Sequence, residues 1–329
     1  MRYPEEVIIK EVGPRDGLQN EKMLVDTSRK VTWINMLSQT GLKEIEYSSF
    51  VHPKWIPQLR DAIDVGKKID RAPGVKYSAL VPNEKGLENA LEAGIDGASV
   101  FMSASESHNE KNINKSIEAT FPILEPVILQ AKREQKEVTG YVSTVFECPF
   151  EGKIKIDDVL RVVDRLFEYG VDYVSLGDTI GTAVPQDVER LLEEVLYRYP
   201  AKNIILHFHD TTGMAMANIL TSMQYGINRF DASLGGLGGC PYAPGAAGNV
   251  ATNDLVYMMN NQAIDTGIDE WKLFEASQYM SRKLEKELPS RAYSYMLNST
   301  ASENEEEQLR KREVLYFFLK KQYDRIRNM

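Results

Sequence analysis

The sequence predicts an α/β fold, a (β/α)8 TIM barrel with a short helical C-terminal extension. Eight short β-branched runs recur before residue 235, and amphipathic stretches lie between most of them. The chain has 329 residues, enough for a barrel of roughly 250 residues as a single domain. Strands that alternate with helices are typical of a parallel sheet, either closed or doubly wound.

A closed barrel fits better than a doubly wound sheet. A doubly wound nucleotide-binding fold carries a Gly-rich turn directly after its first strand. Here the first predicted strand is followed by GPRDGLQN, which does not match G-x-G-x-x-G. Eight strand–helix units in about 230 residues are instead typical of a TIM barrel.

The predicted strands are rich in β-branched residues and are bounded by turn residues. They lie at 7–12, 42–47, 75–80, 97–102, 138–145, 171–176, 204–209 and 228–234. The predicted helices have apolar residues at helical spacing. They lie at 27–40, 84–93, 112–136, 155–169, 185–199 and 213–225.

Residues at the helix ends support these boundaries. Thr27, Asn83 and Asp210 stand where helices, or the loops before them, need capping groups. Several helices end at a glycine with an apolar strand just beyond it, at Gly41, Gly94, Gly170 and Gly226.

The pattern stops at about Ser290, so we divide the chain into a barrel, residues 1–290, and a helical tail, residues 291–329. The tail has an acidic run at 303–307, followed by LRKREVLYFFLKKQYDRIR. We expect a terminal helix that packs Leu315, Phe318 and Leu319 on the barrel or on a neighbouring molecule. A helix that binds another partner is the alternative.

Composition and charge exclude several classes of protein. The net charge is −9, without a basic stripe, which argues against nucleic-acid binding. No stretch approaches the ~18 consecutive apolar residues of a membrane span, and the N-terminus lacks a signal-peptide pattern. Two cysteines are too few for a disulfide scaffold. We therefore expect a cytoplasmic protein that binds neither nucleic acid nor membrane.

Polar side chains concentrate at the C-terminal ends of the predicted strands, where barrels carry their active sites. They are Arg15, Asp16, Gln19 and Asn20 after the first strand, Glu46 on the second, Asp178 after the sixth, His207 and His209 on the seventh, and Cys240 and Asn249 after the eighth. Because the eighth strand closes beside the first, these groups should converge on one half of the barrel mouth.

His207 and His209 predict a metal site. They are two positions apart on a strand, so their side chains point to the same face. Two imidazoles packed against backbone carbonyls are the alternative, but this pair at a barrel mouth favours metal ligation. Asp16 and Asn249 add oxygen ligands, although Asn in a Gly-rich loop often serves only a turn. This mixed set predicts Mg²⁺ or Mn²⁺ rather than zinc.

Arg15 is the candidate electrostatic catalyst. Its guanidinium stays protonated at any relevant pH, and beside a metal it would stabilise a developing enolate oxygen. A salt bridge to Glu46 or Asp178 is the structural alternative and is compatible with that role. Glu46 and Asp178 either orient Arg15 and the metal ligands or act directly, and both roles stay open.

Cys240 lies in a loop with six glycines between residues 235 and 248. Such a loop suits a lid or the close approach of a ligand. A lone cysteine is most often a small buried hydrophobe, but this placement favours acid–base or nucleophilic work. We expect Cys148, in ECPFEG, to be structural.

These residues lie in motifs that closely resemble those of 3-hydroxy-3-methylglutaryl-CoA (HMG-CoA) lyases. The motifs are EVGPRDGLQNEK at 11–22, SFVHPKWIPQ at 49–58, SLGDTIG at 175–181, HFHDTTG at 207–213 and GGLGGCPYAPGAAGNVATNDLVYM at 235–258. The resemblance covers roughly residues 5–290, and the cysteine loop is its most specific part. RDGxQ and HxH occur in a wider superfamily that includes isopropylmalate and homocitrate synthases.

The resemblance implies metal-dependent cleavage of HMG-CoA to acetyl-CoA and acetoacetate, by a homodimer. The implied metal ligands are Asp16, His207, His209 and Asn249. The implied catalytic residues are Arg15, Cys240, His207, Glu46 and Asp178. Either His207 or Asp16 would act as the base, and Cys240 would protonate the enolate carbon.

Three alternatives stay open. A condensing synthase of the same superfamily usually has a longer C-terminal region and lacks the cysteine loop. A lyase for a 3-hydroxy-3-acyl-CoA with a longer chain would share this site, and a non-catalytic scaffold would share the barrel. Lys111 and Lys115 could contact CoA phosphates, but a solvated helix face is favoured. We expect no redox regulation by a C-terminal cysteine, because the tail has none.

Overall fold

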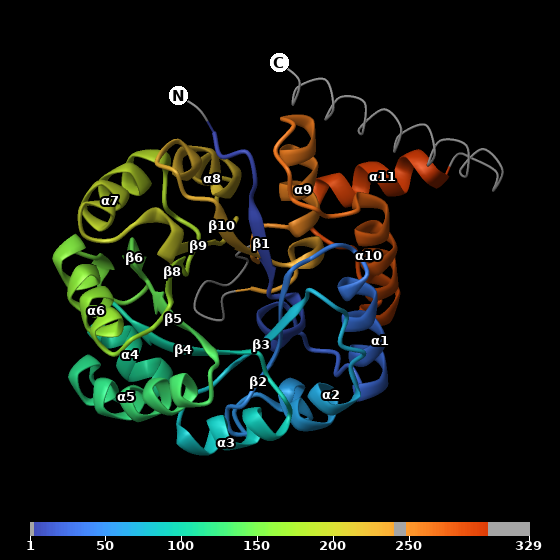
Figure 1. Ribbon diagram of the computed structural model, residues 1–329. Helices are drawn as coiled ribbons and strands as arrows, with labels where there is room; N and C mark the ends of the chain where they lie inside the picture. Colours follow the sequence, from blue (N-terminus) through green and yellow to red (C-terminus); the bar gives the residue numbers. More distant parts are fainter. Residues whose placement is uncertain (1–2, 240–247, 302–329) are drawn as a thin grey trace.

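The computed structural model describes residues 3–239 and 248–301, in which eight parallel strands close into a barrel (Figure 1). The strands follow one another around the barrel in the order β1-β10-β9-β8-β5-β4-β3-β2. Their bounds are β1 Ile8–Glu11, β2 Glu44–Ser49, β3 Lys76–Leu80, β4 Gly97–Ser103, β5 Glu137–Ser143, β8 Tyr173–Asp178, β9 Ile204–Phe208 and β10 Arg229–Ala232. The predicted TIM barrel is confirmed, and β10 closes it against β1 as expected.

Helices form a ring outside the barrel (Figure 1). They are α1 Thr27–Ser38, α2 Ala62–Lys68, α3 Glu84–Glu92, α4 Glu106–Ile113, α5 Ile117–Arg133, α6 Ile156–Glu168, α7 Pro185–Arg198, α8 Ala215–Gln224, α9 Thr252–Asn261, α10 Glu270–Leu284 and α11 Arg291–Ala301. A two-stranded hairpin, β6 Glu147–Cys148 and β7 Gly152–Lys153, follows β5.

The helix predicted at 112–136 is wrong as one element, because α4 and α5 divide it. Asn114 ends α4 with a left-handed backbone, at a φ of 59°. Ser116 then caps α5, because its side chain accepts a hydrogen bond from Ala119 N at 3.1 Å. Helix α2, between the second and third strands, was missing from the predicted elements.

Two of the three predicted capping residues are confirmed. The side chain of Asn83 accepts from Gly86 N at 2.9 Å, and that of Asp210 accepts from Ala215 N at 3.0 Å. Thr27 is wrong as the cap of α1, because Asp26 accepts from Arg29 N at 3.0 Å. The predicted helix-ending glycines all have positive φ, between 76° and 99°, at Gly41, Gly94, Gly170 and Gly226.

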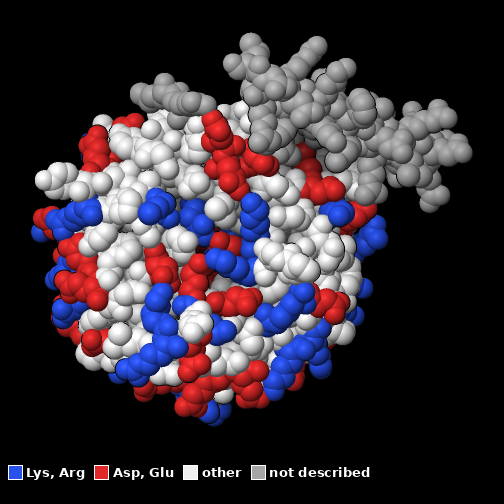
Figure 2. Space-filling model, viewed as in Figure 1, with Lys and Arg blue, Asp and Glu red and all other residues white. Residues whose placement is uncertain are grey.

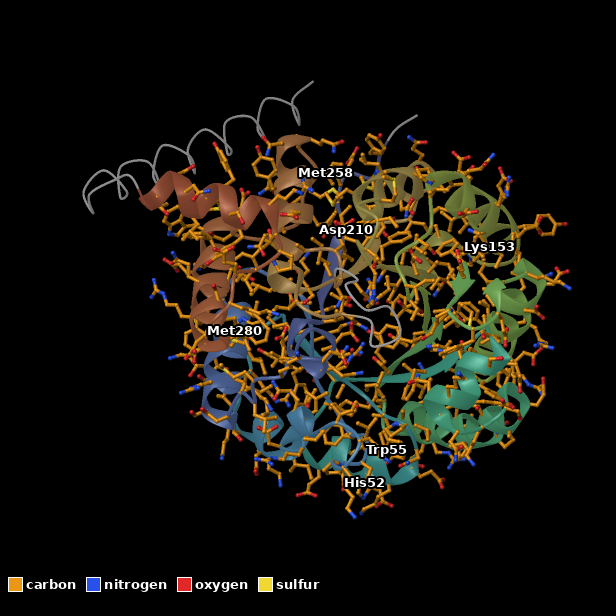
Figure 3. The ribbon with its side chains drawn as sticks, turned by 180° about the vertical axis from the view of Figure 1, so that it is seen from behind. His52, Trp55, Lys153, Asp210, Met258 and Met280 are labelled. Carbon is orange, nitrogen blue, oxygen red and sulfur yellow. The ribbon has the colours of Figure 1, made fainter. Side chains whose placement is uncertain are left out.

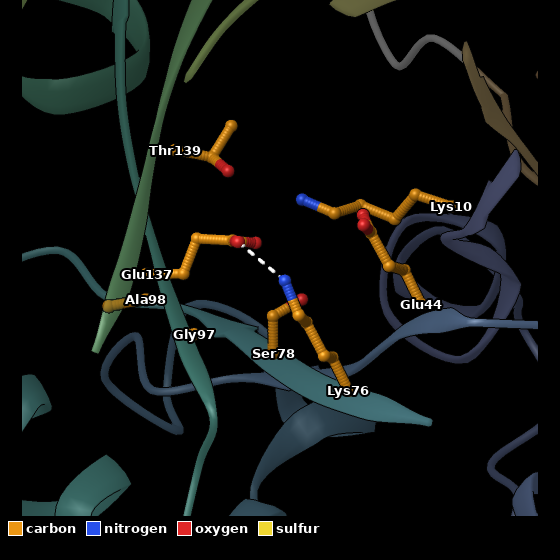
Figure 4. Close-up of a pocket in the computed structure, with 8 residues that line it drawn as sticks. All are labelled: Lys10, Glu44, Lys76, Ser78, Gly97, Ala98, Glu137 and Thr139. Carbon is orange, nitrogen blue, oxygen red and sulfur yellow. Dashed lines mark hydrogen bonds and ion pairs between the residues drawn. The ribbon is translucent and has the colours of Figure 1, made fainter. Parts of the chain in front are cut away.

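Charged side chains line the N-terminal end of the barrel interior (Figure 4). Lys10, Glu44, Lys76 and Glu137 line a cavity of about 10 Å³, and Lys76 Nζ lies 2.6 Å from Glu137 Oε2. A cavity of this size holds about one water molecule. A substrate must therefore enter at the opposite end, where the strands finish.

Helix α11 packs beside α9 and α10 (Figure 1). Asp254 in α9 accepts hydrogen bonds from Ser290 Oγ at 2.6 Å and from Ala292 N at 2.7 Å. Residues 302–329, which include the acidic run and the predicted apolar contacts of the tail, lie outside the described residues. The division at residue 290 therefore stays a prediction.

Acidic and basic side chains intermingle on the face shown in Figure 2. Of the helices in the described part, none is both long and apolar enough to cross a membrane.

Candidate active site

A π-helical turn, Gly13–Gly17, follows β1 and carries Arg15 and Asp16. Three successive amides, those of Arg15, Asp16 and Gly17, donate to Val12 O at 3.1, 2.7 and 3.2 Å. Pro14 is tolerated near the start of the turn, where an N–H has no helical partner. The turn places two charged side chains side by side at the C-terminal end of the barrel.

Asp16, His207 and His209 come together as one cluster at this mouth. Each offers one ligand atom, and these atoms all lie within 4.8 Å of one another. The fourth predicted ligand is beside them, since Asn249 Nδ2 donates to Asp16 Oδ2 at 2.8 Å and to Leu237 O at 3.1 Å. The structure thus brings together all four predicted metal-site residues.

Two buried atoms in this cluster test whether a cation would fit. Within the described residues, His209 Nδ1 and Asn249 Oδ1 are both buried and have no hydrogen-bond partner. Buried polar atoms are rarely left unpaired in native proteins. A divalent cation would be an acceptable partner for an imidazole nitrogen and for an amide oxygen. The donor set therefore fits a metal ion.

The protonation states of Asp16 and His209 also suit metal ligands. Burial opposes the charge of Asp16, but Arg15 and the two histidines hold the pKa of Asp16 well below its usual value. Burial, with the nearby charge of His207, lowers the pKa of His209 to about 4. At neutral pH Asp16 is therefore ionised and His209 is neutral, as metal binding requires.

The predicted salt bridge of Arg15 is to Glu46. Arg15 Nε donates to Glu46 Oε2 at 2.5 Å, and Arg15 Nη1 donates to Asp16 Oδ1. Glu46 is fully buried in β2, and its other oxygen accepts from Tyr141 OH at 3.1 Å. The Tyr141 ring lies under the guanidinium, 5.5 Å from its carbon to the ring centroid. Arg15 is therefore fixed from three sides.

Asp178 organises its own loop at the end of β8. Its carboxylate accepts from Thr182 N at 3.2 Å and from Ala183 N at 3.1 Å. Burial nevertheless raises the pKa of Asp178 to about 6. In the part of the chain that the structure describes, no ion pair joins Asp178 to Arg15.

Cys240 lies outside the described residues, but both flanks of its loop are described. Asn20 Nδ2 donates to Gly239 O at 2.6 Å. Gly248 packs so closely that a Cβ there would lie 2.5 Å from Gly238 O. At Gly238, a Cβ would lie 2.7 Å from Asn249 Nδ2. The two flanks therefore meet beside the metal cluster.

Cys148, by contrast, is buried and accepts a hydrogen bond from Ser105 Oγ at 2.9 Å. This placement agrees with the structural role predicted for it. Of the two lysines considered for CoA phosphates, Lys111 has its Nζ 3.8 Å from the ring centroid of Phe150.

Three residues near the site were missed from the sequence, namely Glu11, Tyr141 and Asp231. Each is a polar side chain within a predicted strand, and each is buried. A charged residue in a buried strand is seldom found without a partner or a function. That signal was available for Glu11 and Asp231, although their partners come from distant strands.

Glu11 joins the π-helical turn to the loop after β10. Its carboxylate accepts from Gly13 N at 2.7 Å, Leu234 N at 2.8 Å and Thr252 Oγ1 at 2.6 Å. It is fully buried, and in the described residues no cation pairs with it. Burial raises the pKa of Glu11 from 4.5 to about 7.

We expect Glu11→Gln to change the pH dependence of stability. The folded protein holds the Glu11 proton up to a pH of about 7, whereas the unfolded chain releases it near 4.5. The free energy of unfolding of the wild type therefore falls between these values as the pH rises. The variant lacks this loss. Between pH 5 and pH 8, its free energy of unfolding should therefore rise by roughly 2–3 kcal/mol relative to that of the wild type.

Urea unfolding of the chelator-treated proteins at both pH values measures this difference. Glu88→Gln is the matched control, because its side chain is exposed, and it should follow the wild type. If the free energies of unfolding of Glu11→Gln and the wild type changed with pH in parallel, Glu11 would not hold its proton in the folded protein as expected.

Comparison with known proteins places this arrangement in a family. A family model described as HMGL-like matches residues 6–280. The hydroxymethylglutaryl-CoA lyase YngG of Bacillus subtilis is 57% identical over 291 residues, which cover 88% of this chain and 97% of that protein.

Comparison with solved structures gives the same family. The crystal structure of the B. subtilis HMG-CoA lyase matches with a TM-score of 0.89 and 56% identity, over 90% of this chain and 99% of that one. An HMG-CoA lyase from Acinetobacter baumannii, in complex with coenzyme A and 3-methylmalate, matches with a TM-score of 0.84 and 39% identity, over 88% of this chain and 95% of that one. The chain belongs to the HMGL-like family, that of the HMG-CoA lyases.

Proposed function

We propose that this protein cleaves HMG-CoA to acetyl-CoA and acetoacetate. The observation that carries this proposal is the contact between the metal cluster and a fixed cation, since Asp16 belongs to the cluster and pairs with Arg15. Relatives named as HMG-CoA lyases, one of them bound to coenzyme A, support an acyl-CoA substrate.

The reaction needs three things from the site. The tertiary hydroxyl of the substrate must lose its proton, the carbon–carbon bond must break, and the electron pair must be held as a thioester enolate until its carbon is protonated. Asp16, His207, His209 and Asn249 would hold Mg²⁺ or Mn²⁺. When bound, such an ion supplies a Lewis acid that orients substrate oxygens and lowers the pKa of the hydroxyl.

Arg15 supplies the fixed charge for the enolate oxygen. Burial acts against its charge, but Glu46 and Asp16 hold the pKa of Arg15 above its usual value. Among the described residues, Nε and Nη1 of Arg15 each donate to a carboxylate and Nη2 makes no hydrogen bond, so the N–H groups of Nη2 are available to substrate. A donor placed in advance costs no reorganisation when charge develops. Glu46, through its bond to Arg15, sets this geometry.

Proton transfers are assigned to groups at the same mouth. Of the two predicted bases, Asp16 takes the hydroxyl proton, because one ring nitrogen of His207 bonds to Asp231 and the other would bind the ion. Cys240 returns a proton to the enolate carbon. Asp178 holds the β8–α7 loop beside His207 through its backbone hydrogen bonds. We further propose that the protein is a homodimer, as the family resemblance implies. We also propose a cytoplasmic location, which the low cysteine content supports.

The direct test is an assay of both products. Purified protein is mixed with HMG-CoA and Mg²⁺ under reducing conditions, and acetoacetate and acetyl-CoA are quantified. We expect equal amounts of both products, and their formation should stop in excess chelator. Folded, metal-loaded protein that forms neither product would contradict the proposal, and substrates with a longer chain at C3 would then be assayed.

Cys240→Ser tests the proposed proton donor. We expect kcat to fall about 100-fold, within the usual range for loss of a general acid, because a serine hydroxyl is a far weaker acid than a thiol. Metal content and thermal stability should stay at the wild-type level. Cys148→Ala is the matched control and should keep the turnover of the wild type. If Cys240→Ser turned over as fast as Cys148→Ala, Cys240 would not be the proton donor.

A further inference from the structure

We infer that Asp231 is a positioning residue of the metal site, because its carboxylate holds the His207 ring so that Nε2 faces Asp16 and His209. The inference rests on the metal site of the proposed function, although not on the identity of the substrate. It concerns a residue of β10 that is not itself a ligand of the proposed ion.

The contact between Asp231 and His207 is direct. Asp231 Oδ2 lies 3.2 Å from His207 Nδ1, and the side chain of Asp231 is fully buried. The two residues are partners in the register of β10 and β9, so their side chains leave the barrel wall on the same face. The pairing therefore follows from the strand register and does not depend on a loop.

A second hydrogen bond fixes the carboxylate itself. Ser175 Oγ, from β8, donates to the same Oδ2 atom at 2.8 Å. Lys10 is the register partner of Asp231 on β1 and supplies a nearby positive charge. A buried carboxylate is costly without such partners. Three neighbouring strands thus converge on one acidic side chain directly beneath the cluster.

The His207 ring is also limited from the side. Tyr141 meets it edge to face, with ring centroids 6.4 Å apart and an interplanar angle of 77°. With Nδ1 occupied by Asp231, the proton of the neutral ring belongs on Nδ1, and Nε2 keeps the lone pair that a metal needs. His207 can then offer only Nε2 to the cluster.

His209 provides an internal contrast. Its buried Nδ1 has no hydrogen-bond partner in the described residues, and among those residues no carboxylate hydrogen-bonds to either nitrogen of the ring. Loss of the carboxylate behind a metal-ligating histidine typically weakens metal affinity about 10–100-fold. The effect of changing Asp231 should therefore reach the metal through His207.

The first experiment measures Mn²⁺ affinity by electron paramagnetic resonance on the full chain. Asp231→Asn keeps an oxygen acceptor but loses the charge, and we expect about 10-fold weaker binding. Asp231→Ala loses both, and we expect about 100-fold weaker binding. Asp61→Asn is the matched control, because Asp61 is a largely buried aspartate bonded to Lys30 and Thr27 away from the cluster. It should bind Mn²⁺ like the wild type.

The second experiment reads the ring itself in the metal-free protein. The chain has four histidines, so their ¹⁵N imidazole signals can be separated and assigned by substitution. At pH 9 we expect His207 to carry its proton on Nδ1 in the wild type and to shift towards the Nε2–H tautomer in Asp231→Ala. A merely structural role for Asp231 would leave this tautomer unchanged.

Unchanged Mn²⁺ affinity in both Asp231 variants would overturn the inference, as would a wild-type His207 protonated on Nε2. If the Asp231 variants fail to fold, Ser175→Ala tests the inference instead. It removes a hydrogen bond to the Asp231 carboxylate and should weaken Mn²⁺ binding several-fold. A wild type that binds no Mn²⁺ overturns the metal site and this inference together. A wild type that binds Mn²⁺ but leaves HMG-CoA intact contradicts only the proposed reaction.

Discussion

His209→Ala is expected to lose its divalent metal and its activity together. His209 contributes one of three ligand atoms that lie within 4.8 Å of one another, and its lowered pKa keeps it neutral and ready to bind. Removing one ligand of a mixed nitrogen and oxygen set should weaken Mn²⁺ binding by at least about 100-fold, a larger effect than loss of an outer partner. Turnover at a fixed metal concentration should fall by at least the same factor.

Equilibrium dialysis of Mn²⁺ and the two-product assay measure these effects. His52→Ala is the matched control, because His52 is exposed at the periphery of the molecule (Figure 3). It should keep the metal affinity of the wild type. Full metal retention by His209→Ala would show that His209 is not a ligand.

Arg15→Met should weaken transition-state stabilisation strongly and also destabilise the protein. Loss of one preorganised donor to an oxyanion costs about 2.7–4 kcal/mol, which is a 10²–10³-fold loss of kcat. The substitution also leaves Glu46 as a buried, uncompensated charge, at a cost of about 3–5 kcal/mol in the free energy of unfolding. Steady-state kinetics and urea unfolding separate the two effects.

A double variant distinguishes these two roles of Arg15. Adding Glu46→Gln to Arg15→Met removes the orphaned charge, so stability should recover while turnover stays low. Arg29→Met is the control, because Arg29 pairs with Asp26 on the exposed surface, where such pairs contribute little. If turnover recovered together with stability, Arg15 would be a structural residue only.

Much of the site could be predicted because its signals are local. Alternation of strands and helices indicated the barrel, and the closure of a barrel brings its last strand beside its first. The His207–His209 spacing alone placed two imidazoles on one face of a strand. Asp16 and Arg15 follow the first strand directly, so their position at the mouth needed no knowledge of packing.

The predictions that were wrong, one helix and one capping residue, also depended on local features of the sequence. One residue in a left-handed conformation, Asn114, divides a stretch whose apolar pattern runs on across it. At the start of α1, Asp26 and Thr27 are both acceptable caps by residue type. The backbone geometry selects Asp26, and Thr27 Oγ1 donates to Asp61 at 2.7 Å instead.

The sequence by itself determined the barrel, the order of its strands and the convergence of Asp16, His207, His209 and Asn249. Only the tertiary structure decided that Arg15 pairs with Glu46 rather than with Asp178, and that Asp231 stands behind His207. Those pairs join residues 24 to 31 positions apart. Their contacts depend on the register between neighbouring strands and on the way a closed barrel directs side chains inward, and neither is encoded in a local pattern of residue types.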